Sequence, residues 1–167
     1  GAYPGIGAEE RGQAEAIARS TQRCLTLGVP MVVAIVGEGG SGGALGIAAG
    51  NTVMMMEHAI YAVAEPGSAA SILFRDNARA KDVAVAMKIT AQDLLQLKVI
   101  DGIIDEPLGG AHRQPEKAIA AVGAAVAKAL DKLANLSPEA LKKQRRDRYY
   151  AIGRDLPSAT PAKTSKK

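Results

Sequence analysis

Apolar runs with the length of short strands recur along the chain, separated by segments with helical spacing. The β-branched run "MVVAIV" at 31–36 predicts a buried strand, and "TVMMM" at 52–56 and "AIYAVA" at 59–64 predict two more. A fourth candidate strand is "VIDGIID" at 99–105. Strands that alternate with helices in this way are typical of an α/β protein.

A long helix is predicted between the opening loop, 1–7, and the first strand. Glu9 and Glu15 near its start and Arg23 near its end complement the helix dipole, and Gly28 followed by Pro30 ends it. Its inner stripe, at spacings of three and four, consists of Ala14, Ile17, Ala18, Thr21, Cys24 and Leu25. Cys24 is therefore interpreted as a small core residue rather than a nucleophile.

More helices are predicted in the second half of the chain. A turn leads into a helix within 65–73, and helical segments follow at 76–88 and 91–97. Pro115 and Pro138 occupy favourable first positions of two further helices, the last of which reaches about 152. The inner stripe of the helix from Pro115 is Ile119, Val122, Val126, Leu130 and Leu133. One domain over 1–153 and a disordered basic tail over 154–167 are expected.

The composition adds a mild positive charge and little aromatic character. The chain has 21 basic and 17 acidic residues, a net charge of +4, one Phe and no Trp. Much of the excess lies in "KKQRRDR" at 142–148 and in the tail, which favours a solvated helix face, with a surface for a polyanionic ligand as the alternative. Nucleic acid is not expected, because no aromatic platform accompanies the charge.

Cys24 is the only cysteine, which excludes an internal disulfide and favours a reducing compartment. Since neither a long apolar span nor a signal-peptide pattern is present, a cytoplasmic protein with no membrane segment is expected. The chain opens on Gly1 without Met, and we interpret it as a fragment. No Ser–His–Asp arrangement and no metal-ligand spacing is found.

The segment "GEGGSGGALGIAAG" at 37–50 carries the candidate chemistry, and three hypotheses compete for it. Gly37, Gly39 and Gly42 satisfy the G-x-G-x-x-G pattern of a dinucleotide site, but the helix that follows is short for that role. Small residues also permit close packing of a helix on a sheet. The third hypothesis is an oxyanion hole, in which unpaired N–H groups at a helix start meet a carbonyl or enolate that glycines allow to approach.

Three blocks of the sequence, "GAYPGIGAEERGQAEAIA" (1–18), "GVPMVVAIVGEGGSGGALGI" (28–47) and "IDGIIDEPLGGAHRQPE" (100–116), are specific enough to carry a resemblance. Together they resemble the carboxyltransferase alpha subunit of bacterial acetyl-CoA carboxylase. The resemblance covers about 1–153 and only the C-terminal half or so of such a subunit. It implies a truncated crotonase-like (ClpP/crotonase) α/β fold, a spiral of ββα turns.

The resemblance also implies an activity. The subunit would transfer the carboxyl group of carboxybiotin, held on the biotin carboxyl carrier protein, to acetyl-CoA, giving malonyl-CoA for fatty acid synthesis. Biotin itself would take the methyl proton, and no metal would be needed in this chain. The partners implied are a beta subunit in an α2β2 assembly, the carrier and biotin carboxylase, in an ATP-dependent complex. The alternatives are an inactive crotonase-like module and a nucleotide-binding α/β domain.

The roles of single residues follow from the same resemblance. Backbone N–H groups of the helix start would form the oxyanion hole for the biotin ureido oxygen, while the beta subunit would hold the thioester oxygen and most of the coenzyme A. The donors would be Gly42, Gly43 and Ala44, and the substrate-binding residues would be Gly39, Gly40, Ala2, Tyr3 and Gly5.

One segment departs from the family pattern. Members of the family read Ser-Pro-Glu-Gly-Cys where this chain has "AEPGSA" at 64–69, and we therefore assign Glu65 no catalytic role. His58 and His112 are interpreted as structural loop residues. Glu38, the only charge in the glycine segment, is expected either to orient the loop or to contact a partner.

Overall fold

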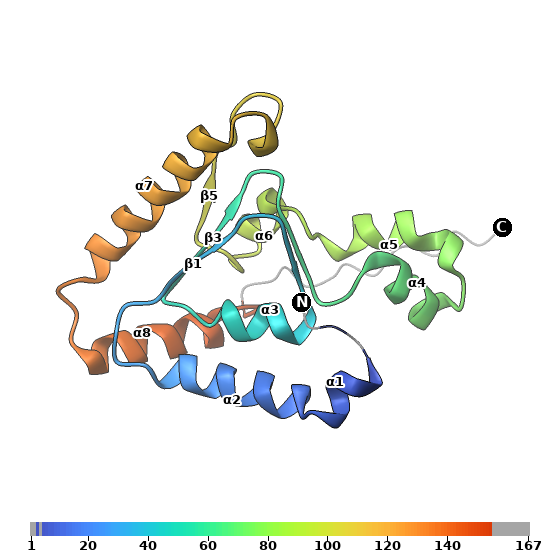
Figure 1. Ribbon diagram of the computed structural model, residues 1–167, viewed down its shortest axis with the longest axis horizontal. Helices are drawn as coiled ribbons and strands as arrows, with labels where there is room; N and C mark the ends of the chain where they lie inside the picture. Colours follow the sequence, from blue (N-terminus) through green and yellow to red (C-terminus); the bar gives the residue numbers. More distant parts are fainter. Residues whose placement is uncertain (1–2, 4, 155–167) are drawn as a thin grey trace.

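Parallel strands form the centre of the molecule (Figure 1). The computed structural model describes residue 3 and residues 5–154. Strands β1 (Val32–Ile35), β3 (Thr52–Met56) and β5 (Gly102–Ile104) form one sheet in the order β1-β3-β5. Strands β2 (Glu38–Gly40) and β4 (Ile60–Ala62) form a second parallel pair. The four predicted strands are confirmed, β3 with the predicted bounds and the other three with shorter ones, and β2 lies within the glycine segment, where no strand was predicted.

Helices surround these strands, and within the described residues none is long and apolar enough to cross a membrane. They are α1 (Ile6–Glu10), α2 (Gln13–Thr26), α3 (Ser41–Ile47), α4 (Pro66–Phe74), α5 (Ala80–Met87), α6 (Ala91–Gln96), α7 (Pro115–Leu133) and α8 (Pro138–Ala151), with the short 3-10 helices η1 (Asn77–Arg79) and η2 (Ala111–Arg113). In Figure 1, α2, α3 and α8 lie below the sheet, α7 runs along its other side, and α4 and α5 project away from it.

The order of the elements repeats as a ββα unit. The unit β1-β2-α3 is followed by β3-β4-α4, and each strand lies parallel to its counterpart in the next unit. Val32 pairs with Thr52, and Glu38 pairs with Ile60, so successive units are stacked in register. In both units the helix follows the second strand, which is how α3 comes to begin at the glycine segment.

The core is built around β3, whose side chains are covered on both faces. Met54, Met55 and Met56 expose 8%, 0% and 3% of their surface, so the prediction that the methionine run fills the core is confirmed. Methionine suits this role because its flexible side chain can fill irregular space in a core. Helix α7 packs against β1 and β5, and it contributes Ala118 and Ala129 to the same core.

The long N-terminal helix of the sequence analysis is two helices. Gly12 has φ +76°, a left-handed conformation that interrupts the helix between α1 and α2. The predicted inner stripe is only partly correct, because Ile17, Thr21 and Cys24 are half-buried while Ala14, Ala18 and Leu25 are exposed. Helix α2 contacts α3 and α8, and no described residue of α2 is fully buried. Cys24 is therefore a partly exposed boundary residue, not a core residue.

The stripe predicted for α7 is partly correct, because Val122 and Val126 are partly buried and pack against the core. Ile119 and Leu130 are 71% and 39% exposed, whereas Leu133 is buried as predicted. The core-facing side also includes alanines that the prediction left out, with Ala118 and Ala129 buried. Small side chains let the helix approach the sheet closely, and a pattern of large apolar residues alone cannot reveal that preference.

Candidate active site at the start of helix α3

The glycine segment folds as a sharp strand-to-helix turn. Gly40 is extended, with φ −139° and ψ 143°, and Ser41 has φ +55°, in the left-handed region. A helix that begins at Ser41 takes its first intrahelical bond from the N–H of Ala44, so the N–H groups of Gly42 and Gly43 have no partner within the helix. The predicted donors Gly42 and Gly43 thus lie at the positive end of α3, whereas Ala44 is engaged in the helix itself.

The glycines of this region divide into two groups by the space around them. A Cβ at Gly39 would lie 2.9 Å from Cδ2 of Tyr61, and one at Gly50 would lie 2.9 Å from Cγ2 of Val33, so both are required for packing. A Cβ at Gly40 would meet nothing within 4 Å, and one at Gly42 would meet only Cγ2 of Ile17, at 3.7 Å. Packing therefore explains Gly39 and Gly50 but not Gly40 and Gly42.

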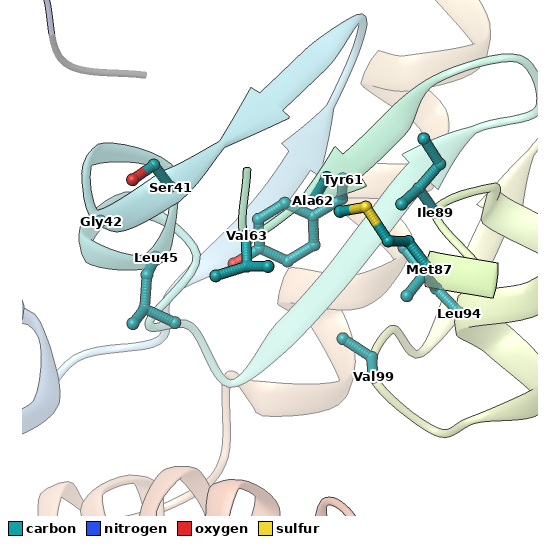
Figure 2. A pocket seen from close by; sticks show the side chains of 10 residues that line it. All are labelled: Ser41, Gly42, Leu45, Tyr61, Ala62, Val63, Met87, Ile89, Leu94 and Val99. Carbon is teal, nitrogen blue, oxygen red and sulfur yellow. The ribbon is translucent and has the colours of Figure 1, made fainter. Parts of the chain in front are cut away.

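An apolar cavity of about 350 Å³ opens beside this turn (Figure 2). It lies between the start of α3, strand β4 and the segment from α5 to the end of α6. Its lining is Ser41, Gly42, Leu45, Tyr61, Ala62, Val63, Met87, Ile89, Leu94 and Val99. Figure 2 shows the Tyr61 ring in the middle of this lining, with the Ser41 hydroxyl beyond it. A cavity of this size suits a compact, largely apolar group.

Two residues of the cavity lining, Tyr61 and Ser41, carry a hydroxyl group. The backbone N–H of Tyr61 donates to the Ile89 carbonyl at 3.1 Å, which fixes β4 beside the loop before α6. Burial, followed by the nearby Tyr149, raises the pKa of the Tyr61 hydroxyl, and Arg148 opposes the shift. The hydroxyl is therefore protonated at neutral pH and is available as a hydrogen-bond donor.

The predicted N-terminal part of the site is described only in part. Ala2 lies outside the described residues. Tyr3 is 77% exposed, and its carbonyl accepts a hydrogen bond from Nε2 of Gln13 at 2.9 Å. Gly5 caps α1, and a Cβ there would lie 2.5 Å from Cε1 of Tyr3, so the glycine admits the Tyr3 ring. Neither Tyr3 nor Gly5 lines the cavity beside α3.

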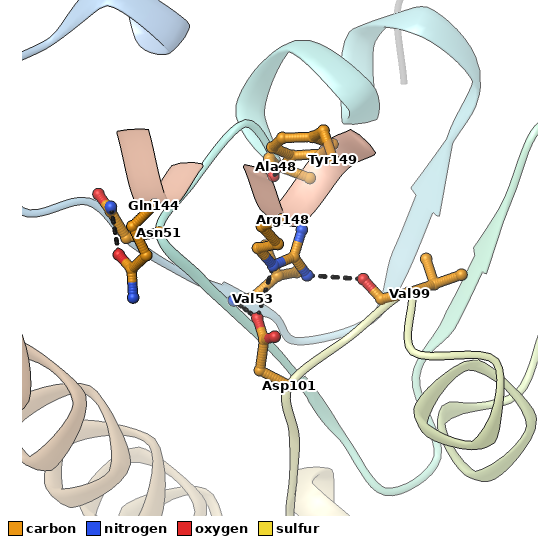
Figure 3. A network of polar contacts seen from close by, with 8 residues as sticks. All are labelled: Ala48, Asn51, Val53, Val99, Asp101, Gln144, Arg148 and Tyr149. Atoms are coloured by element: carbon orange, nitrogen blue, oxygen red, sulfur yellow. Dashed lines mark hydrogen bonds and ion pairs between the residues drawn. The ribbon is translucent and has the colours of Figure 1, made fainter. Parts of the chain in front are cut away.

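A polar network anchors α8 beneath the strands that position α3 (Figure 3). Oδ2 of Asp101 accepts from the Val53 N–H at 2.7 Å and from Nε of Arg148 at 2.9 Å. Arg148 also donates to the Val99 carbonyl at 2.7 Å. The Tyr149 hydroxyl donates to the carbonyl of Ala48, just after α3. The end of α3 is thus tied to the C-terminal helix.

Arg145 is the most deeply buried charged residue among those described, at 0% exposure. Its guanidinium donates to the Cys24, Leu27 and Val29 carbonyls at 2.7–2.9 Å, and to Oδ1 of Asn51 at 2.6 Å. Burial lowers its pKa from the ordinary value, with Cys24 and Tyr149 opposing. The prediction that 142–148 is a solvated face is therefore wrong for Arg145 and Arg148, whose partners lie in distant segments.

Two further carboxylates have structural roles. Glu65 caps α4 by accepting from the N–H groups of Gly67 and Ser68 at 3.3 and 3.2 Å. Glu106 accepts from the N–H groups of His58 and Ala111, both at 3.0 Å, and so joins the β3–β4 turn to the loop before η2. Burial raises the pKa of Glu106, but these hydrogen bonds outweigh it and leave the pKa lowered.

The described residues hold no group of three or more His, Cys, Asp or Glu side chains arranged to bind a metal ion. The donors gathered at the turn are instead backbone N–H groups and hydroxyls, which suit a neutral carbonyl or an oxyanion.

A family-wide sequence profile decides the relationship of this chain. The family described as acetyl co-enzyme A carboxylase carboxyltransferase-like matches residues 1–153. The chain belongs to this family. The resemblance seen in the three sequence blocks is confirmed, and the predicted donors Gly42 and Gly43 lie within the matched residues.

Individual members of the carboxyltransferase family are close in sequence. The chain is 66% identical over 154 residues to the acetyl-coenzyme A carboxylase carboxyl transferase subunit alpha of Caulobacter vibrioides, covering 92% of this chain and 48% of the relative. It is 64% identical over 156 residues to the subunit of the same name from Methylobacterium nodulans, covering 93% and 49%. The chain thus spans about half the length of the curated relatives that it matches.

Solved structures share the fold. A transcarboxylase 12S structure with methylmalonyl-coenzyme A and methylmalonic acid bound superimposes with a TM-score of 0.64 at 20% identity, covering 79% of this chain and 25% of that one. A Pseudomonas malonate decarboxylase hetero-tetramer in complex with coenzyme A gives 0.64 at 16% identity, covering 88% and 59%. The crotonase-like fold expected from the sequence is confirmed.

Proposed function

We propose that this chain is part of a carboxyltransferase alpha subunit of acetyl-CoA carboxylase. The complete enzyme would move a carboxyl group from carboxybiotin to acetyl-CoA and produce malonyl-CoA. The observation that carries the proposal is the position of the Gly42 and Gly43 N–H groups, which α3 itself leaves without a partner, in a chain of the carboxyltransferase family. The first of these glycines also lines the apolar cavity.

The surroundings of α3 fit the ring that a biotin-bearing carrier would present. Space is open beside Gly40 and Gly42, so a flat ureido group can approach the backbone without meeting a side chain. The carried biotin supplies the activated carboxyl group and a nitrogen that accepts the methyl proton. The part of this chain is to hold the ureido oxygen with N–H groups that are fixed in advance, a contribution of roughly 3–4 kcal/mol per donor in comparable sites.

The side chains of the cavity wall would exclude water from the bound group and would offer it one polar contact. Apolar side chains such as Leu45, Met87 and Leu94 surround the space beside the donors. A low-polarity surrounding strengthens hydrogen bonds to a developing negative charge. The Tyr61 hydroxyl, protonated at neutral pH, lies within the same lining and would orient the bound group. The family resemblance would add Ala2, Tyr3 and Gly5 to the residues that bind the ring.

A beta subunit, in an α2β2 assembly, would complete the site. Large apolar residues of α4 and α5 support a protein partner, because Ile72, Leu73 and Val85 expose 77%, 67% and 72% of their surface. The biotin carboxyl carrier protein and biotin carboxylase would be the other partners, and the complex would be cytoplasmic. A dinucleotide site is disfavoured by α3, whose seven residues are short for the helix of such a unit.

The proposal is tested in the reverse direction, with the full-length chain and its beta partner. Malonyl-CoA and a soluble biotin derivative are supplied, and formation of acetyl-CoA is followed. We expect turnover only when both chains are present. Tyr61→Phe should retain the fold and weaken use of the biotin derivative about tenfold, as expected for loss of one hydrogen bond. A stable, assembled pair without turnover would favour the inactive crotonase-like module.

A further inference from the structure

A second and larger cavity, of about 970 Å³, lies between α2, α3 and α8. Leu45 lines both this cavity and the one beside the start of α3, so the two spaces are neighbours. Its volume is at the upper end of the range found for small-molecule sites, and it exceeds what a single phosphate or acetate group needs. The transfer reaction described above does not use it.

The α8 wall of this cavity is cationic. Lys142, Lys143 and Arg146 line it, and Glu139 is the only carboxylate among the described residues of the lining. Lys143 and Arg146 both face Asp147, at 2.5 and 3.8 Å, whereas no ion pair with the described residues engages Lys142. Even with Glu139 and Asp147 counted against them, these three cations leave this wall with a net positive charge, which favours an anionic ligand.

The remaining wall is aromatic and apolar. The Tyr149 ring is held in place by the hydrogen bond from its hydroxyl to the Ala48 carbonyl. Tyr150 is 63% exposed at the cavity, and Leu25 and Leu45 are 38% and 51% exposed. A flat ring would cover such a surface, because tyrosine rings and leucine side chains stack well on planar heterocycles.

We propose that this cavity binds an adenine nucleotide with at least two phosphates, the phosphates against Lys142, Lys143 and Arg146 and the ring against Tyr150 and Leu25. Two sources share this chemistry, a free nucleotide such as ADP and the nucleotide end of coenzyme A. Binding of a free nucleotide is independent of the proposed carboxyl transfer. Binding of coenzyme A rests on that proposed function, since coenzyme A is then a product or substrate carrier of the enzyme.

The experiment is equilibrium binding by calorimetry to the full-length protein, purified with its carboxyltransferase partner. The probes are ADP, coenzyme A and pantetheine, which lacks the nucleotide. The cavity variant is the double substitution Lys142→Gln with Arg146→Gln, and the control is Lys117→Gln with Lys128→Gln, which removes the same charge from α7. No turnover is needed, so a failure here is separable from a failure of the proposed function.

We expect ADP to bind, the cavity variant to weaken that binding at least about tenfold, and the α7 control to leave it unchanged. Binding of both ADP and coenzyme A points to the shared nucleotide, and binding of ADP alone to a free nucleotide. Equal losses in both variants would show general attraction of charge and overturn the proposal. Absence of ADP binding, or an ADP affinity that the cavity variant does not change, would overturn it as well, because coenzyme A binding that the variant leaves unchanged reports the beta subunit.

Discussion

The turn into α3 and the helix α8 are both part of the helical side of the molecule below the sheet, but they act through different groups. The turn acts through its backbone, and α8 acts through its side chains. At the turn, Gly42 and Gly43 offer backbone N–H groups, and the absence of side chains keeps the approach open. In α8, Arg145 and Arg148 act through long side chains that bind carbonyls far away in the sequence. We propose that the first region receives a ligand, whereas the second region holds the first in position.

This difference separates two kinds of mutational effect. A substitution in the α8 network removes hydrogen bonds and leaves buried partners unsatisfied, so it should lower stability first. A substitution at an open glycine of the α3 turn adds a group where only a ligand would otherwise lie, so it should lower the rate with little change in stability.

Arg145→Met should have the largest effect on stability. The substitution keeps an apolar stem but leaves the Cys24, Leu27 and Val29 carbonyls and Asn51 without their donor. We expect the free energy of unfolding to fall by about 3–5 kcal/mol in urea titration of the full-length protein. The exposed neighbour Arg146→Met is the control, with a change of about 0.5 kcal/mol or less. Equal losses in the two variants would contradict the network.

Asp101→Asn should have an intermediate effect. The substitution removes the negative charge of a partly exposed carboxylate that accepts hydrogen bonds from the Val53 N–H and from Arg148. A loss of about 1–2 kcal/mol in the free energy of unfolding is expected, and it should shrink at high salt. Asp105→Asn, at an exposed position on the same segment, should change it by less than about 0.5 kcal/mol. A loss at Asp105 as large as that at Asp101 would show a general charge effect instead.

Glu106→Gln should alter how stability depends on pH. Because the pKa of Glu106 is lowered from its ordinary value of 4.5, its ionised form stabilises the fold above that pH. This stabilisation is lost as the pH falls through the lowered pKa. Between about pH 6 and pH 3, the melting temperature should therefore fall less steeply with decreasing pH for Glu106→Gln than for wild type. The exposed Glu10→Gln should reproduce the wild-type slope, and an unchanged slope for Glu106→Gln would refute the assignment.

Ser41→Gly should have the smallest effect. The substitution relieves the left-handed backbone at Ser41 but adds the entropy cost of glycine, so the net change in unfolding free energy should be below about 1 kcal/mol. Turnover should stay within about threefold, because the donors are assigned to the backbone. A loss of activity with unchanged melting would instead assign chemistry to the Ser41 hydroxyl.

The sequence predicted the elements and the α3 turn well because their causes are local. An apolar run followed by glycines and a small-residue segment defines β1, the turn and α3 within 31–47, and Pro115 and Ser137 mark helix starts by their own chemistry. The family resemblance then identified which of the glycine hypotheses to prefer.

The rest could not be predicted, because its causes are distant in sequence. Arg145 binds carbonyls about 116–121 residues away, and Asn51 reaches Leu141 and Gln144 from 90 and 93 residues away. In sequence, these residues look like part of a charged helix face. The break at Gly12 and the alanine-rich contact face of α7 were missed for a related reason, since tertiary contacts override the pattern of large apolar residues.

The central claim is that the open glycines of the α3 turn serve a reaction, whereas glycines such as Gly50 serve packing. The direct test compares Gly42→Ala with Gly50→Ala in the full-length chain with its beta partner, measuring both kcat/KM for the reverse reaction and the melting temperature. We predict at least a roughly tenfold lower kcat/KM for Gly42→Ala with an unchanged melting temperature. For Gly50→Ala, where the new Cβ would meet Val33 at 2.9 Å, we predict a fall of several degrees, for a cost of about 1–3 kcal/mol. If Gly42→Ala turned over like wild type, or lost activity only in step with its stability, the backbone site would be contradicted.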